Sequence, residues 1–170
     1  LEDGAKTETS RFLQGKRNGE TFTFYPNGAM KSKCYYLNDL LEGEEIFFGQ
    51  NKKIIAKTNY HQGLREGEET IYGPNGIIQR KSRYHADLLE GESISYYSTG
   101  NVKEVTHFSK DQKNGISTAF YENGMKRAQC NYKDGLLEGL CLWYYDSGEI
   151  ESQSFFRQGK QEGEYISYYK

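Results

Sequence analysis

Apolar and polar residues alternate along short stretches of this chain, and the stretches are separated by turn-forming residues. Residues 20–25 and 29–36 alternate in this way on either side of Asn27-Gly28, a pattern typical of two β-strands joined by a tight turn. The other turns of this kind are Asn75-Gly76, Asn123-Gly124 and the weaker Thr99-Gly100 and Ser147-Gly148. We expect two-residue type I′ turns here, with Asn and Gly both at positive φ. The pattern predicts hairpins throughout and no helix.

A period of 24 residues runs through the whole chain without insertion or deletion. It is carried by Gly19, Gly43, Gly67, Gly91, Gly115, Gly139 and Gly163. A second glycine series, which includes Gly28, keeps the same step and misses only at Lys52. A fixed repeat of this length indicates stacked units that bury surface against their neighbours, here seven of them. We expect each recurring glycine to serve a tight backbone path or to leave space for a ring.

The repeats predict an all-β fold: an elongated, single-layer antiparallel β-meander of seven hairpins and about fourteen strands. The longer connection at residues 39–43 is expected to reverse the chain into the next repeat. We expect a single repeat domain over residues 1–170, with both ends open. The chain lacks an initiator Met, so we interpret it as an excised or processed form. Open strand edges make edge-to-edge self-association an expected property.

Two columns of the repeat are aromatic in all seven copies, although hydrophobic residues make up only 35% of the chain. The first column contains Tyr96 and Tyr144, and the second contains Tyr36, Tyr60, Tyr84 and Tyr132. A lone sheet has no second layer, so rings packed across neighbouring strands must supply its burial. We interpret both columns, like the recurring glycines, as structural.

Aromatic residues outside these columns gather in the C-terminal half, and they are the first candidates for a partner-binding site. They are Tyr97, Tyr121, Trp143, Tyr145, Phe155 and Tyr169. Strand alternation places the tyrosine ladder and Trp143 on one face, with Phe155 and Tyr165 as further members. This stripe is either an uncovered binding surface or a second packed face.

Acidic residues form a second ladder beside the recurring glycines, and Glu66, Glu68, Glu90 and Glu92 are its partner-binding candidates. The ladder either steers a basic partner or is a solvated rim that keeps the sheet soluble.

Candidate chemistry beyond binding is sparse. His61 and His85 lie one repeat apart, about 10 Å by strand spacing, and no acidic or Cys partner recurs at ligand spacing. We therefore expect no catalytic residue, no metal and no cofactor. A net charge of −2 argues against nucleic-acid binding. Cys130 and Cys141 lie on adjoining strands, where they either form a disulfide or fill space as thiols, and they leave the compartment unassigned.

The recurring Glu-Gly-Glu step, the aromatic pair and the Asn-Gly turn together resemble the MORN repeat in its bacterial variant form. Clear copies run from Glu90-Gly91-Glu92 through Tyr96-Tyr97 to Gly100, and from Glu162-Gly163-Glu164 through Tyr168-Tyr169. The resemblance implies a non-enzymatic interaction scaffold with a protein partner, and for the bacterial type an antitoxin-like role. Trp143 is the only Trp, whereas the better-known form has one in each copy.

Two other functions stay open from the sequence. Exposed aromatic repeats of this kind also suit a glycan or cell-wall ligand, although such repeats usually hold more Trp. Binding to a phospholipid surface would need a basic face.

Overall fold

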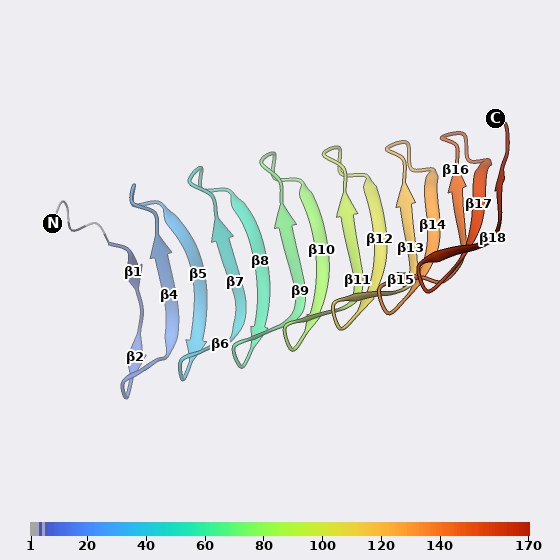
Figure 1. Ribbon diagram of the computed structural model, residues 1–170. Helices are drawn as coiled ribbons and strands as arrows, with labels where there is room; N and C mark the ends of the chain where they lie inside the picture. Colours follow the sequence, from blue (N-terminus) through green and yellow to red (C-terminus); the bar gives the residue numbers. More distant parts are fainter. Residues whose placement is uncertain (1–3, 5) are drawn as a thin grey trace. The chain divides into compact units, whose positions relative to one another are not determined.

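The computed structural model describes residue 4 and residues 6–170, and all the regular structure of this part is β-strand (Figure 1). The strands are β1 (Glu8–Thr9), β2 (Phe12–Leu13), β3 (Lys16–Arg17), β4 (Gly19–Phe24), β5 (Met30–Leu37), β6 (Leu40–Leu41), β7 (Gly43–Phe48), β8 (Ile54–His61), β9 (Leu64–Tyr72), β10 (Ile78–His85), β11 (Leu88–Tyr96), β12 (Val102–Ser109), β13 (Gln112–Phe120), β14 (Lys126–Lys133), β15 (Leu136–Leu137), β16 (Gly139–Tyr144), β17 (Ile150–Arg157) and β18 (Lys160–Ser167).

Sixteen of these strands belong to one antiparallel sheet whose order follows the sequence. The predicted all-β antiparallel meander, with no helix among the described residues, is therefore confirmed. The chain divides into two compact units, the first formed by residues 1–78 and 84–87 and the second by residues 79–83 and 88–170. The order is β1-β4-β5-β7-β8-β9 in the first unit and β11-β12-β13-β14-β16-β17-β18 in the second.

The Asn-Gly turns differ from the prediction. Gly28 N donates to Tyr25 O at 2.8 Å and Tyr25 N donates to Ala29 O at 2.8 Å, while only Gly28 in this loop has a positive φ (78°). These contacts define a three-residue loop, a type I turn followed by a left-handed glycine. Asn27 instead fixes the loop through its side chain, whose Oδ1 accepts from Ala29 N at 3.0 Å. The prediction of type I′ geometry was wrong because the left-handed residue is the glycine alone.

Type I′ turns do occur, at the opposite ends of the strands. Both central residues have a positive φ at Gln14-Gly15, Asn38-Asp39, Gln62-Gly63, Ala86-Asp87, Lys110-Asp111, Asp134-Gly135 and Gln158-Gly159. Positive φ at two successive residues is the signature of the type I′ hairpin. The expected long connection at residues 39–43 is therefore a two-residue turn followed by the short strand β6.

The recurring glycines have one conformational role. All seven, from Gly19 to Gly163, have φ between 76° and 119°. A Cβ at Gly43 or Gly139 would meet nothing within 4 Å, so the backbone conformation and not crowding selects glycine at those two positions. Close to this position the ladder between β8 and β9 shifts register between Thr58 and Tyr60. A shift of this kind bends the strand, as bulges do.

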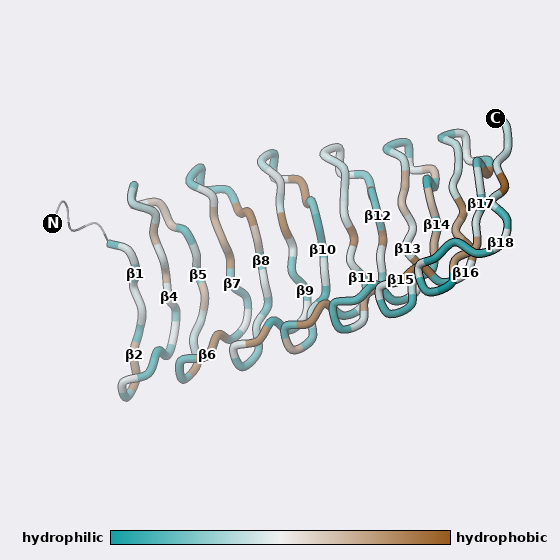
Figure 2. Tube along the Cα trace, viewed as in Figure 1, coloured by the Kyte–Doolittle hydropathy of each residue, from teal (hydrophilic) through white to brown (hydrophobic). Residues whose placement is uncertain are grey.

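Burial is concentrated on one face of the sheet, which we call the Ser/Thr face. Its central side chains are Thr21, Ser32, Cys34 and Thr58 in the first unit and Ser82, Thr106, Ser117, Cys141, Ser152 and Ser154 in the second, each at most 7% exposed. Small hydroxyls pair across strands, as between Ser82 and Ser93 at 3.0 Å and between Thr106 and Ser117 at 2.8 Å. The column aromatics beside them are half-buried. Hydropathy accordingly alternates along the strands (Figure 2).

Candidate functional site

The predicted tyrosine stripe is tied into the sheet. The hydroxyls of Tyr97, Tyr121 and Tyr145 each donate to a backbone carbonyl oxygen 23 residues further on, at 2.7 Å. The acceptors are the carbonyls of Phe120, Tyr144 and Tyr168, members of the first aromatic column. Each tyrosine thus links one repeat to the next. Tyr169 is fully exposed.

Two of the predicted acidic candidates, Glu66 and Glu90, accept hydrogen bonds from backbone N–H groups of the same chain. Glu66 accepts from Ala86 N and pairs with His85 Nδ1, both at 3.0 Å. The hydrogen bond from His85, followed by the one from Ala86 N, lowers the pKa of Glu66. Glu90 accepts from Lys110 N at 2.9 Å in the same way. These carboxylates hold the type I′ turn of the following repeat.

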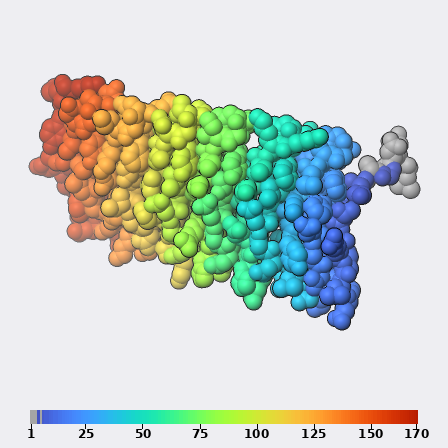
Figure 3. Space-filling model, turned by 180° about the vertical axis from the view of Figure 1, so that it is seen from behind, coloured from blue at the N-terminus to red at the C-terminus, as the bar shows by residue number. Residues whose placement is uncertain are grey.

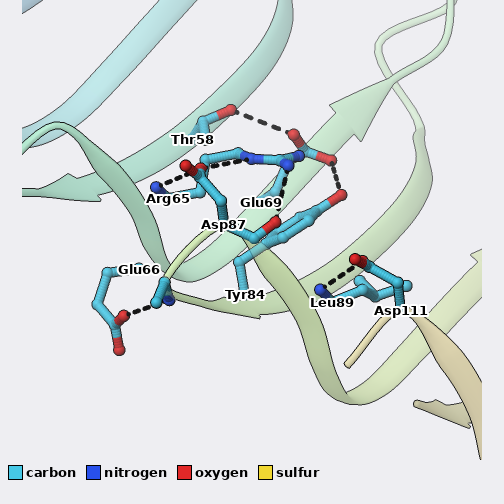
Figure 4. Close-up of polar contacts among 9 residues, drawn as sticks. Thr58, Arg65, Glu66, Glu69, Tyr84, Asp87, Leu89 and Asp111 are labelled. Carbon is cyan, nitrogen blue, oxygen red and sulfur yellow. Dashed lines mark hydrogen bonds and ion pairs between the residues drawn. The ribbon is translucent and has the colours of Figure 1, made fainter. Parts of the chain in front are cut away.

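A second carboxylate ladder fixes the same turns. Asp87 Oδ1 accepts from Arg65 N at 2.8 Å and Arg65 Nε at 3.2 Å, and Arg65 also stacks over the Tyr84 ring at 4.0 Å (Figure 4). Asp111 accepts from Leu89 N at 2.8 Å in the second unit. Successive repeats are therefore joined by polar side chains, an arrangement that the sequence analysis did not predict. Figure 3 shows the repeats of each unit as successive bands.

The remaining acidic candidates, Glu68 and Glu92, lie on the face opposite the Ser/Thr face, which we call the ladder face. In the first unit this face carries cross-strand ion pairs, Glu20–Lys33 at 2.9 Å and Glu44–Lys57 at 3.5 Å. Glu92 lies 3.8 Å from His107 Nε2 in the second unit, and Glu68 accepts from Thr70 Oγ1 at 3.0 Å. Exposed pairs of this type stabilise little and keep the face hydrated.

The acidic column of the ladder face is interrupted after Glu92 and resumes at Glu164. Ile116 and Leu140 occupy the column of Glu20, Glu44, Glu68 and Glu92, and they are 50% and 48% exposed. Phe155, 42% exposed, is the cross-strand partner of Leu140. Asn131, the cross-strand partner of Ile116, is the only polar member of this row. We call Ile116, Leu140 and Phe155 the apolar row.

Phe155 was expected on the same face as Trp143, and the register contradicts this. Phe155 pairs with Leu140 and Trp143 pairs with Ser152. Leu140 and Trp143 are three positions apart, and an odd separation in a strand places side chains on opposite faces. The sequence signal that could have found the row is the break in the acidic column at Ile116 and Leu140.

Trp143 lies on the Ser/Thr face, where it lines an open hollow of about 230 Å³. The lining residues are Glu104, Ser117, Ala119, Ala128, Cys130, Tyr132, Leu137 and Trp143. The Trp143 ring also meets Phe156 edge-on, with centroids 6.4 Å apart. Cys130 forms a disulfide with Cys141, which settles the alternative that the sequence left open. The disulfide occupies the columns that hold the Thr106–Ser117 hydroxyl pair one repeat earlier.

Among the described residues, no group of three or more His, Cys, Asp or Glu side chains is arranged to hold a metal ion. No helix in this part of the chain is long and apolar enough to cross a membrane.

A hairpin sheet whose repeats are joined by side-chain ladders defines a class of β-hairpin repeat protein, and comparison with known families agrees. The family model described as MORN repeat variant matches residues 17–38, 65–86, 89–110, 113–134 and 137–158. The chain therefore belongs to the MORN repeat variant family, whose repeats are non-enzymatic modules for protein or membrane interaction.

Comparison with individual proteins adds no function. No curated protein matches the chain. Among the matching solved structures is a crystal structure of a GtfA/B complex bound to UDP and GlcNAc, with 10% identity and a TM-score of 0.29 over 77% of this chain. The match spans 28% of that chain, and a likeness at this level carries no argument.

Proposed function

We propose that the protein is a non-catalytic scaffold that binds a protein partner, and that the partner docks on the apolar row. The observation that carries the proposal is that Ile116 and Leu140 replace the glutamates of the ladder-face ion pairs and lie beside Phe155, each of the three close to half exposed. An apolar patch that is uncharged at its centre is the usual composition of an interface core.

The surroundings of the row support the same proposal. Glu92 and His107 lie on one side, and the ion pair between Arg157 Nε and Glu162, at 3.2 Å, lies on the other. An apolar centre with a charged rim suits a partner that presents apolar side chains ringed by polar ones. A toxin-neutralising role is one form that such binding can take, and the identity of the partner decides it.

The test substitutions can be taken from the chain itself, because other repeats have polar residues at the positions of the apolar row. Ile116→Glu and Leu140→Glu restore the acidic residue of that column, and Phe155→Asn restores the Asn59 or Asn131 of its own column. The triple variant should fold, since each new residue already occupies the same place in a neighbouring repeat. We expect it to lose a partner that the wild-type protein captures from the source cell and then binds when both are purified.

The matched control removes an ion pair from the same face of the first unit, as Glu44→Gln with Lys57→Gln. It should bind like the wild type, with Kd measured by calorimetry on the purified partner. Equal binding by the triple variant would refute the apolar row as the docking surface. Retention of polysaccharide alone would replace the protein-scaffold proposal with glycan binding, and vesicle binding with a steep salt dependence would replace it with a membrane role.

A further inference from the structure

The hollow beside Trp143 is lined by residues of β12, β13, β14, β15 and β16 in the second unit. Ala119 and Ala128 form its floor, on neighbouring strands where they are cross-strand partners. The column of Ala119 holds large residues at Phe47, Ile71 and Trp143 and small ones at Thr23, Ser95 and Ser167. At Ala119 the small side chain leaves space beside Trp143 that a residue as large as Phe47 would fill.

One carboxylate oxygen in this hollow has no partner among the described residues. Glu104 Oε1 accepts from Thr106 Oγ1 at 3.0 Å and Ser117 Oγ at 3.1 Å, and lies 3.5 Å from Lys113 Nζ. Burial raises the pKa of Glu104, but Lys113 and the two hydroxyls outweigh it and bring the pKa below its usual value. The carboxylate is thus ionised at neutral pH. Glu104 Oε2 stays open to a donor from a ligand.

Lys113 is the cation beside the other carboxylate oxygen, Glu104 Oε1. In the first unit Arg17 and Arg65 each stack on a column tyrosine at 4.0 Å, and a turn aspartate anchors each guanidinium. Lys113 lies 4.9 Å from the centroid of Tyr132, and the position of that aspartate is occupied by Gly135. Without the anchor, a flexible ammonium group can turn away into solvent.

We propose that this hollow binds a guanidinium group, the arginine side chain of a polypeptide, between Glu104 Oε2 and the rings of Trp143 and Tyr132. An ionised carboxylate accepts only, so the ligand must bring N–H or O–H donors. A guanidinium supplies planar donors for the carboxylate and a flat cation for the aromatic faces. An anionic ligand would be repelled by the negative charge of Glu104. The site lies on the face opposite the apolar row and does not depend on it.

The only Trp of the chain is a wall of this site, so its fluorescence reports directly on occupancy. N-acetyl-arginine amide would be titrated against the folded protein, with emission and calorimetry recorded on the same samples. N-acetyl-citrulline amide, which has the same shape without the charge, is the matched control. We expect saturable binding of the arginine compound and at least about tenfold weaker binding of the citrulline compound.

Three variants test the named contacts. Glu104→Gln keeps an acceptor for the two hydroxyls and should weaken binding by about tenfold or more, because the charge is lost. Lys113→Met removes the competing cation and should tighten binding several-fold. Ala119→Phe introduces the residue that Phe47 provides in the same column. Its ring should fill the hollow and abolish binding. Far-UV circular dichroism and urea midpoints verify that each variant is folded.

Several results would overturn the proposal. They are the absence of calorimetric heat with the arginine compound, equal affinity for the citrulline compound, no change in Glu104→Gln, or weaker binding in Lys113→Met. Saturable binding of a neutral monosaccharide that depends on Trp143 and leaves arginine unbound would assign the hollow to a sugar instead.

Discussion

Replacing the disulfide by a serine pair tests how the central line of the Ser/Thr face is stabilised. The change is Cys130→Ser with Cys141→Ser, and it reproduces a pair that the chain already uses, because Ser82 and Ser93 are hydrogen-bonded at 3.0 Å in the same columns. The variant should therefore keep the fold. What it loses is the cross-link.

The size of the loss follows from the loop that the disulfide closes. The two cysteines are separated by 11 residues. The chain-entropy relation gives about 2.8 kcal/mol for a loop of this length at 25 °C. A new hydroxyl–hydroxyl hydrogen bond should return about 1 kcal/mol. The expected net decrease in the free energy of unfolding is about 2 kcal/mol.

Urea unfolding measured through Trp143 fluorescence is the appropriate assay, because Trp143 lies on the same strand as Cys141. With an m value of about 2 kcal/mol/M, the midpoint should fall by roughly 1 M. Reduced wild-type protein should show a decrease of similar size. A change below about 0.5 kcal/mol in both samples would refute the reasoning, since the cross-link would then contribute little to this part of the sheet.

Three further outcomes follow from the contacts between and within repeats. Asn114 replaces the glutamate that holds the next turn in other repeats, so Asn114→Glu with Asp134→Gln should raise the free energy of unfolding by about 1 kcal/mol in urea. Tyr121→Phe should lower it by about 1 kcal/mol, because a carbonyl loses its donor. Two substitutions in the first unit should have opposite pH dependence. The pKa of Glu42 is lowered, first by a backbone N–H of the next turn, so its stabilisation is present above pH 4.5 and lost as pH falls through the folded pKa. The pKa of Glu45 is raised by burial, so its stabilisation is present below pH 4.5 and lost as pH rises through the folded pKa. Glu42→Gln should thus destabilise and Glu45→Gln stabilise at pH 7, and urea midpoints at pH 4 and pH 7 check both; equal effects at the two pH values would contradict the assignment.

The repeat and its hairpins could be predicted from the sequence because a 24-residue period places the same turn residues at each copy. The turn type could not. Asn27-Gly28 suits either a type I′ turn or a type I turn followed by a left-handed glycine. The structure has the second of these, a three-residue loop. The true type I′ turns carry varied residues: Asp134-Gly135 has the sequence typical of such a turn, whereas Asn38-Asp39 and Ala86-Asp87 do not, so sequence alone could not identify the whole set.

The candidate site was predicted less well than the fold because contacts between repeats decide which side chains are free. The hydroxyl of Tyr121 binds a carbonyl 23 residues away, a relation that strand alternation does not contain. Glu66 and Glu90 look exposed in the sequence, yet each holds the next turn. Trp143 was predicted as a candidate because it shares a face with the off-column tyrosines, and the hollow beside it, which Ala119 also lines, could not be read from that alternation.

These contacts explain how a regular sheet can acquire a local site. The ladders that join repeats use a few columns and largely backbone acceptors or donors, so the other columns are free to change without loss of the fold. A residue that departs from its column is then informative, because the repeat does not require it. Ile116 and Leu140 depart from an acidic column, and Ala119 is a small residue in a column that holds Phe47, Ile71 and Trp143 in other repeats. Both features lie in adjoining repeats of the second unit, one on each face of the sheet. Function in this chain is therefore to be sought where the repeat is broken, and the repeat itself supplies the neutral substitution for each test.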